Sequence, residues 1–289
     1  MTRSLTRRSF LIVAAALPLL PALAAEKGDA LQRLSELETT FAGRLGVVAI
    51  NTGNGDVLSY RGDEAFPLCS TFKAMLAAAI LQRSVLTPEL LEKRITYRKS
   101  DLVTYSPVTE KHVQDGMTVT ELCAATVQYS DNSAANLLLK LLDGPEGLTT
   151  FARSIGDQHF RLERWETELN SAIPGDLRDT TTPLAMARSL QRLVIGDALP
   201  HMQREQLQAW LRGNTTGATR IRAGVPAAWQ VGDKTGTGDY GTTNDVAVLW
   251  PPGKAPVVLT VYLTQNSKDA SPRNETLAAA TRVVVDWLQ

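Results

Sequence analysis

Ser70 and Lys73 place a hydroxyl and an amine three residues apart, in the sequence Ser-Thr-Phe-Lys. On a helix, residues i and i+3 share a face, so the lysine amine can reach the serine hydroxyl. A serine hydroxyl becomes a good nucleophile only when a neighbouring base takes its proton. Residues 74–81 are apolar and rich in helix formers, which predicts a buried helix opening near Ser70. Taken alone, such a tetrapeptide more often has a surface or capping role.

Three further motifs carry polar side chains that could act on a ligand. Residues 130–132 read Ser-Asp-Asn and lie between two helical patterns, at a connection that aims short polar side chains. Residues 234–236 read Lys-Thr-Gly in a strand-like run, where the glycine admits a ligand close to the backbone. Glu166 and Asn170 lie in a polar stretch without periodicity. Each motif alone is most often structural.

Apolar periodicity predicts the elements that must position these motifs. Helices are expected at residues 29–42, 71–84, 119–129, 132–142, 145–155, 183–195, 201–212 and 274–288. Strands are expected at 45–51, 56–61, 229–237, 243–250 and 257–265, the first two joined by a Thr-Gly-Asn-Gly turn.

Strands at both ends of the chain bracket a helical middle. This order predicts an α/β protein of the two-lobed α+β kind, with an antiparallel sheet of about five strands whose terminal helices lie on one face. The expected boundaries put residues 26–62 and 216–289 in the lobe with the sheet and residues 63–215 in an all-helical lobe. A cleft between two such lobes is a natural ligand site.

Composition and charge exclude some classes of protein. The chain has 289 residues, of which 44% are hydrophobic and 21% charged, which suits a soluble globular protein with a sizeable core. The formal net charge is zero, and residues 1–25 hold three arginines and no acid, so the rest of the chain is slightly acidic. The sequence lacks the clustered basic excess that nucleic-acid binding requires.

Residues 1–25 have the pattern of an export signal. A basic segment precedes the apolar run 10–20, and residues 22–24 read Ala-Leu-Ala, a small-x-small cleavage pattern. The run is too short and too interrupted by proline to span a membrane. Residues 6–11 are similar to a twin-arginine signal, and the alternative is an ordinary secretory leader with two arginines. We therefore expect a bacterial periplasmic protein without a membrane or lipid anchor.

The chain has two cysteines, Cys69 and Cys123. An oxidising compartment would permit a bridge between them. Cys69 adjoins the candidate nucleophile, however, and Cys123 lies inside an apolar pattern. Buried free thiols that pack as small hydrophobic groups are therefore expected.

The four motifs S-x-x-K, S-D-N, E-x-x-L-N and K-T-G occur in this order along the chain. Together they resemble the motif set of the class A serine β-lactamases. The resemblance runs from about residue 28 to the C-terminus, and the two-lobed layout fits that family's fold. It implies an enzyme that confers antibiotic resistance by hydrolysing the β-lactam ring of penicillins and cephalosporins. It also implies a monomer that uses no cofactor and no metal.

The resemblance assigns catalytic roles. Ser70 would attack the lactam carbonyl and become acylated, and Lys73 would help to take its proton, with Glu166 acting through a water as the rival base. Glu166 and Asn170 would hold the water that attacks the acyl-enzyme. Ser130 would pass a proton to the departing lactam nitrogen.

The resemblance also assigns substrate contacts. The backbone N–H groups of Ser70 and Thr237 would form the oxyanion hole. Many family members carry an arginine at the position of Thr243, and a subset carries it at the position of Arg220 instead. Arg220 is therefore assigned to the substrate carboxylate, and a solvated surface arginine is the alternative. The complete implied set is Tyr105, Asn132, Arg220, Lys234, Thr235, Gly236 and Thr237.

Other residues are expected to shape the site. Arg164 and Asp179 resemble the ion pair that closes the loop carrying Glu166 in this family. Asp131 and Asn136 are expected to support the backbone rather than to touch substrate. A carbapenem-hydrolysing subset bridges the residue beside the nucleophile to the position of Gly238, and that bridge cannot form here. Penicillins and early cephalosporins are the expected substrates, oxyimino-cephalosporins fit Thr237 and Gly238, and carbapenems remain open.

Three other functions compete with this interpretation. A penicillin-binding D,D-peptidase shares the nucleophile, the lysine and K-T-G, but it lacks a residue that delivers a deacylating water. A β-lactam receptor that signals after acylation would need a membrane anchor. A zinc hydrolase would need clustered ligands, whereas His112, His159 and His201 are scattered.

Overall fold

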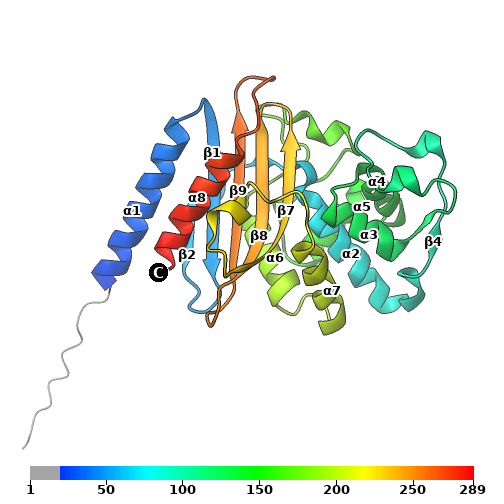
Figure 1. Cartoon of the computed structure of the whole chain (residues 1–289), viewed down its shortest axis with the longest axis horizontal. Coiled ribbons are helices and arrows are strands. Elements are labelled where there is room, and N and C mark those ends of the chain that lie inside the picture. The colour runs from blue at the N-terminus through cyan, green and yellow to red at the C-terminus, as the bar shows by residue number, and fades with distance from the viewer. Residues whose placement is uncertain (1–19) are drawn as a thin grey trace, which may run out of the picture.

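A five-stranded antiparallel sheet forms the centre of the computed structural model, which describes the backbone of residues 20–289 and side chains from Glu26 onward (Figure 1). The strand order is β2-β1-β9-β8-β7, so β7 is an edge strand. Two pairs of two-residue strands lie outside this sheet. The bounds of the sheet strands are β1 Gly43–Asn51, β2 Val57–Tyr60, β7 Gln230–Gly238, β8 Thr242–Trp250 and β9 Val257–Gln265.

Tight turns set the register of the sheet. The turn between β1 and β2 contains Gly55 at φ +80°, a backbone conformation that glycine adopts without strain. Tyr240 and Gly241 also have positive φ, and they close the turn that pairs Thr237 of β7 with Thr243 of β8. This register carries the Lys-Thr-Gly motif along the free edge of the sheet.

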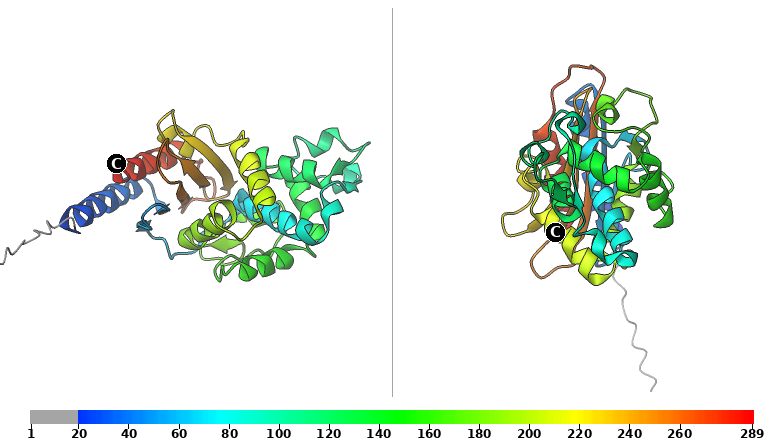
Figure 2. Two further views of the ribbon diagram at one scale, coloured as in Figure 1. Left: turned by 90° about the horizontal axis from the view of Figure 1, so that it is seen from below. Right: turned by 90° about the vertical axis from the view of Figure 1, so that its right-hand side faces the viewer.

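The two terminal helices, α1 (Leu20–Thr39) and α8 (Asn274–Trp287), lie side by side over one face of the sheet (Figures 1 and 2). Leu34 is fully buried there, and it belongs to an apolar cluster with Leu45 and Leu259 of the sheet and Val284 of α8. This cluster buries the apolar side chains on that face of the sheet. Burial of apolar surface is the dominant favourable term in folding.

Helices of the middle of the chain cover the other face and the β7 edge (Figure 1). Apart from Lys73, residues 72–81 of helix α2 are apolar, and all of them are buried, as expected for a helix at the centre of a core. The helix bounds are α2 Phe72–Leu86, α3 Val119–Gln128, α4 Asn132–Leu141, α5 Pro145–Ser154, α6 Pro183–Leu190 and α7 His201–Arg212. Short strands pair β3 Phe66–Pro67 with β6 Thr180–Thr181 and β4 Arg94–Ile95 with β5 Met117–Thr118.

The sequence predicts this architecture closely, although several boundaries differ, most of all in the first helix and in the expected helix 183–195. The expected helix 183–195 divides into α6 and a π-helical turn at Gln191–Ile195, where the Gly196 N–H donates to the Gln191 carbonyl. The first helix begins at Leu20 rather than at residue 29 and ends at Thr39 rather than at residue 42. Near its end, the Glu38 carboxylate accepts the Leu45 N–H of β1 at 2.8 Å. Both cysteines are buried and unpaired, as expected.

Residues 1–19, which carry the twin-arginine pattern, lie outside the described residues. From Leu20 onward, no helix combines the length and the apolar character that a membrane span requires.

The packing of α1 generates a stability prediction. Leu34→Ala should lower the free energy of unfolding by about 2–5 kcal/mol, because it removes transfer energy and leaves a cavity between helix and sheet. Gln32→Ala, on the exposed side of the same helix, should change it by less than about 0.5 kcal/mol. Urea unfolding of the two variants measures both effects. Equal midpoints would show that α1 contributes little to the fold.

Candidate active site

Ser70 lies at the start of the central buried helix. It belongs to a short 3-10 turn, Cys69–Thr71, that continues directly into α2. The Thr71 hydroxyl donates to the Leu68 carbonyl at 2.7 Å and fixes this turn. Ser70 retains only 9% of its exposure. A helix N-terminus stabilises negative charge that develops nearby.

Lys73 lies one turn along α2, as the S-x-x-K spacing predicts, and it is completely buried. Its Nζ lies 2.9 Å from Glu166 Oε1. It also donates to the Ser130 carbonyl at 2.8 Å and to Asn132 Oδ1 at 2.6 Å. Burial lowers the pKa of Lys73 below its usual range, and the attraction of Glu166 opposes that shift. The amine is therefore easier to deprotonate than an exposed lysine.

Glu166 reaches the nucleophile from a separate loop. Its Oε1 accepts from Ser70 Oγ at 3.4 Å, and its Oε2 accepts from Asn170 Nδ2 at 2.6 Å. Asn136 of α4 holds the Glu166 backbone from both sides: its Nδ2 donates to the carbonyl, and its Oδ1 accepts the N–H, each at 3.0 Å. The carboxylate is thus placed by its own backbone as well as by its side-chain contacts.

Arg164 and Asp179 close the loop that carries Glu166. The Arg164 Nε donates to Asp179 Oδ2 at 2.6 Å. The other carboxylate oxygen of Asp179 accepts the Glu163 and Arg164 N–H groups at 2.7 and 2.9 Å. The two side chains are only 16% and 1% exposed, so solvent screens this pair far less than a surface ion pair.

A second lysine approaches from the sheet edge. Lys234 Nζ donates to Ser130 Oγ at 3.1 Å and to the Thr235 carbonyl at 2.8 Å. Burial and the like charge of Lys73 hold the pKa of Lys234 well below its usual range. The Ser130 hydroxyl is also 3.5 Å from Lys73 Nζ, so it lies between the two lysines. The backbone of Ser130 has φ +59°.

Arg220 lies beneath the same edge and is 7% exposed. Its guanidinium donates to the Gly236 and Asn244 carbonyls at 2.8 and 2.7 Å, to Thr237 Oγ1 at 2.7 Å, and to Asn274 Oδ1 at 2.9 Å. Burial lowers the pKa of Arg220. The alternative of a solvated surface arginine is therefore wrong.

One cavity of about 380 Å³ lies between the β7 edge and the helical part of the chain, with Ser70 in its wall and the buried Lys73, Glu166 and Lys234 behind its lining. Tyr105 lies at its rim, 56% exposed and with φ +63°. The lining residues are Ser70, Tyr105, Ser130, Asn132, Asn170, Thr216, Arg220, Thr235, Gly236 and Thr237. Thr243 is not among them, because it is fully buried and its hydroxyl donates to the Gly241 carbonyl.

Two contributors are absent from the sequence-based set. Thr216 lines the cavity, and its hydroxyl lies 2.5 Å from that of Thr235. Asn274, at the start of α8, orients Arg220 from a segment 54 residues away. Thr216 stands close to Arg220 in the sequence and could have been suspected. Asn274 has no sequence signal, because only the fold brings the start of α8 beside Arg220.

Asp131 has contacts within the protein framework only. Its Oδ1 accepts the Ala134 N–H at 2.8 Å as the N-cap of α4, and its Oδ2 accepts the Val108 and Thr109 N–H groups at 2.9 Å each. Asn132, its neighbour, donates from Nδ2 to the Thr104 carbonyl at 2.8 Å while it accepts from Lys73.

Gly238 allows the loop and the sheet edge to approach closely. A Cβ at this position would lie 2.6 Å from the Asn170 carbonyl oxygen and 2.7 Å from Cys69 Sγ. Any side chain at residue 238 would therefore displace either the loop that carries Asn170 and Glu166 or the turn beside Ser70.

Comparisons with known proteins decide the family. Residues 29–288 match the model of the "Beta-lactamase enzyme family". The chain is 56% identical to β-lactamase OXY-1 of Klebsiella oxytoca over 291 residues, covering 100% of both chains. It is 54% identical to β-lactamase Toho-1 of Escherichia coli, covering 98% of each. The chain belongs to the class A β-lactamases.

Solved structures agree with this assignment. A β-lactamase from Desulfarculus baarsii superposes with a TM-score of 0.90 at 61% identity, covering 91% of this chain and 98% of that one. A mutant of an ancestral Gram-negative class A β-lactamase gives a TM-score of 0.87 at 59% identity, covering 90% and 98%. The predicted family and fold are thus confirmed. In the part of this β-lactamase that the structure describes, no group of three or more His, Cys, Asp or Glu residues is placed to hold a metal ion.

The low pKa of Lys234 generates a pH prediction. As pH rises, Lys234 loses its charge earlier than an exposed lysine with a pKa of about 10.4, so binding of an anionic substrate weakens there. Arginine keeps its charge over this range. Lys234→Arg should therefore move the basic limb of the kcat/KM profile for a penicillin to higher pH. Exposed Lys268→Arg is the control. An unmoved limb in Lys234→Arg would contradict the assignment.

Proposed function

We propose that this β-lactamase hydrolyses penicillins and cephalosporins through an acyl-enzyme on Ser70, with Glu166 serving deacylation. One observation carries the proposal: Glu166 Oε1 lies 3.4 Å from Ser70 Oγ and 2.9 Å from Lys73 Nζ. A base within hydrogen-bond reach of a serine hydroxyl is what an activated nucleophile requires. Glu166 therefore lies within reach of the nucleophile, and Lys73 pairs with the same carboxylate oxygen.

In acylation, Ser70 Oγ loses its proton to Lys73, or to Glu166 through a water, and attacks the lactam carbonyl carbon. The C–N bond of the ring then breaks, and Ser130 gives its hydroxyl proton to the departing nitrogen. Lys234 and Lys73 lie within hydrogen-bond distance of Ser130 Oγ and can restore that proton. The carbonyl oxygen would be stabilised by N–H groups of Ser70 and of Thr237 on the edge strand β7.

In deacylation, Glu166 takes a proton from a water that attacks the ester carbon, and Ser70 Oγ leaves with a proton. Asn170 supports this role. Its Nδ2 binds the Glu166 carboxylate, and its Oδ1 is buried without a hydrogen-bond partner among the described residues. A buried amide oxygen in this state is a ready acceptor for the attacking water.

Cationic and hydroxyl groups at the sheet edge would bind the substrate carboxylate. Thr235, Thr237 and Arg220 line the cavity there, and the Arg220 guanidinium donates to the Thr237 hydroxyl. Lys234 lies behind this wall, where it donates to the lining residue Ser130. Asn132 still has one amide hydrogen for the substrate's side-chain amide, because an amide nitrogen offers two donors. The aromatic ring of Tyr105 would pack on the substrate at the rim.

We also propose the organisation in which this enzyme works. Residues 26–62 and 216–289 form one lobe and residues 63–215 the other, with the active site in the cleft between them. The enzyme acts as a monomer without cofactor, is exported to the periplasm by residues 1–25 through the twin-arginine route, and confers antibiotic resistance there. Penicillins and early cephalosporins are its substrates, and Thr237 and Gly238 admit oxyimino-cephalosporins.

A chromogenic cephalosporin in excess distinguishes this function from its nearest rivals. We expect sustained turnover, because Glu166 and Asn170 would position and activate the water that hydrolyses the acyl-enzyme. A D,D-peptidase or a β-lactam receptor would give a single burst of product equal to the amount of protein. Continuous absorbance measurements separate the two results, and a lone burst would refute the hydrolase.

Glu166→Ala tests the deacylation role. The variant should still be acylated by a penicillin but should release product at least about 100-fold more slowly, since general bases contribute 10²–10⁴-fold. Intact-protein mass spectrometry would then show a persistent adduct on Ser70. Glu168→Ala, an exposed residue of the same loop, should behave like the wild type. Rapid release from Glu166→Ala would assign deacylation to another group.

A further inference from the structure

We infer that Thr149 of α5 is a positioning residue for Glu166, which it holds in register by binding the backbone of Leu162. Thr149 does not line the cavity that contains Ser70. The inference rests on the proposed role of Glu166 in deacylation and extends it to a residue on the far side of the loop.

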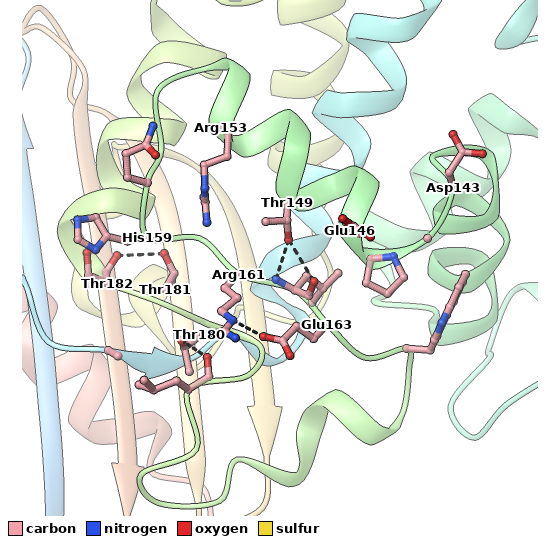
Figure 3. Close-up of a pocket in the computed structure, with 17 residues that line it drawn as sticks. Asp143, Glu146, Thr149, Arg153, His159, Arg161, Glu163, Thr180, Thr181 and Thr182 are labelled. Carbon is pink, nitrogen blue, oxygen red and sulfur yellow. Dashed lines mark hydrogen bonds and ion pairs between the residues drawn. The ribbon is translucent and has the colours of Figure 1, made fainter.

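Thr149 faces a second cavity, of about 900 Å³, behind the loop that carries Glu166 (Figure 3). Its walls are α5, residues 158–163 and residues 180–182, with Trp165 and Leu177 of the loop. Figure 3 shows the Thr149 hydroxyl directed from α5 across to the extended segment that leads into the loop. Thr149 therefore bonds α5 to this segment at the wall of the cavity.

The Thr149 hydroxyl pairs with both backbone groups of one residue. Its Oγ1 accepts the Leu162 N–H at 3.0 Å and donates to the Leu162 carbonyl at 3.1 Å. A threonine inside a helix commonly bonds to a carbonyl of its own preceding turn. Here both capacities of the hydroxyl are used on a segment outside the helix, so the contact joins two elements.

The path of the segment explains why Leu162 needs this partner. The Arg161 N–H donates to the Thr180 carbonyl at 2.9 Å, which closes the neck of the loop. In extended backbone, successive residues direct their N–H and C=O groups to opposite sides. The groups of Leu162 therefore point away from residue 180 and toward α5. Leu162 is 1% exposed, and backbone groups that are buried without a partner are costly.

Thr149 and Asn136 hold the loop in the same manner. Asn136 of α4 pairs with the N–H and C=O of Glu166, and Thr149 of α5 pairs with those of Leu162. Between them, the Asp179 carboxylate accepts the N–H groups of residues 163 and 164. The contact of Thr149 with Leu162 thus positions the start of the segment, and the contact of Asn136 with Glu166 positions the residue that carries the catalytic carboxylate. A shift at residue 162 would be transmitted over four residues to Glu166.

Three variants isolate the hydroxyl. Thr149→Val replaces it with a methyl group of similar size, so both hydrogen bonds are lost with little change in side-chain volume. Thr149→Ser keeps the hydroxyl and should rescue the function. Thr150→Val makes the same chemical change on the next, exposed residue of α5 and controls for the effect of valine on the helix.

The readout is the deacylation rate constant per active serine. Active sites are titrated first, and the enzyme is then mixed with a penicillin. Intact-protein mass spectrometry of quenched samples measures the acylated fraction over time. Thr149→Val should deacylate about 10-fold more slowly, since a 1 Å misplacement can cost up to 10²-fold. The acyl-enzyme should accumulate at steady state. Thr149→Ser and Thr150→Val should match the wild type.

A merely structural role would give a different pattern. Thr149→Val would then show a lower melting temperature or fewer titrated sites, with an unchanged deacylation rate per site, and the inference would be overturned. If Thr149→Val does not fold, Thr149→Ala takes its place with the same readout and the same two outcomes. Glu166→Ala, run in parallel, identifies a failure of the underlying role: free turnover of that variant would remove the basis of the inference independently of residue 149.

Discussion

Lys73 Nζ and Glu166 Oε1 lie 2.9 Å apart, and neither side chain keeps any exposed surface. Removing an ion from water costs several kcal/mol even after relaxation, so a buried pair persists only when further hydrogen bonds satisfy both partners. The fold supplies them from separate segments. Lys73 is satisfied by the carbonyl of Ser130 and the amide of Asn132, and Glu166 is satisfied by Asn170. The pair therefore requires two segments, the connection at residues 130–132 and the loop at residues 166–170, to meet at one end of α2.

That requirement accounts for much of the surrounding architecture. The loop carrying Glu166 is held through its backbone by Asn136 and Asp179, so the position of the carboxylate does not depend on the flexible side chain alone. The second lysine, Lys234, enters the same dry region and adds a like charge. Strain is concentrated here too: Tyr105 and Ser130 both have positive φ, a conformation that persists only where the surroundings impose it.

The sequence predicts the elements well because their signals are local. Apolar periodicity places α2 and the strands of the sheet, and the four short motifs point to Ser70, Glu166 and Lys234. What the sequence does not predict depends on contacts between distant segments. Asn274 orients Arg220 across 54 residues, and nothing in the local pattern of α8 marks it. The burial of the pair formed by Arg164 and Asp179 is likewise a property of the packed loop. The sequence predicts that this pair closes the loop, but it does not predict that the pair is shielded from solvent.

Burial lowers the pKa of Lys73, and the negative charge of Glu166 opposes that fall. The most direct test is an NMR titration of ¹³C-labelled lysine side chains, with the Lys73 signal assigned by its absence from Lys73→Arg. We expect a pKa below the ordinary lysine value of about 10.4. We also expect a further fall in Glu166→Gln, where the opposing negative charge is gone. A Lys73 pKa at or above the ordinary value, or one that Glu166→Gln leaves unchanged, would show that burial and Glu166 do not act on Lys73 in this way.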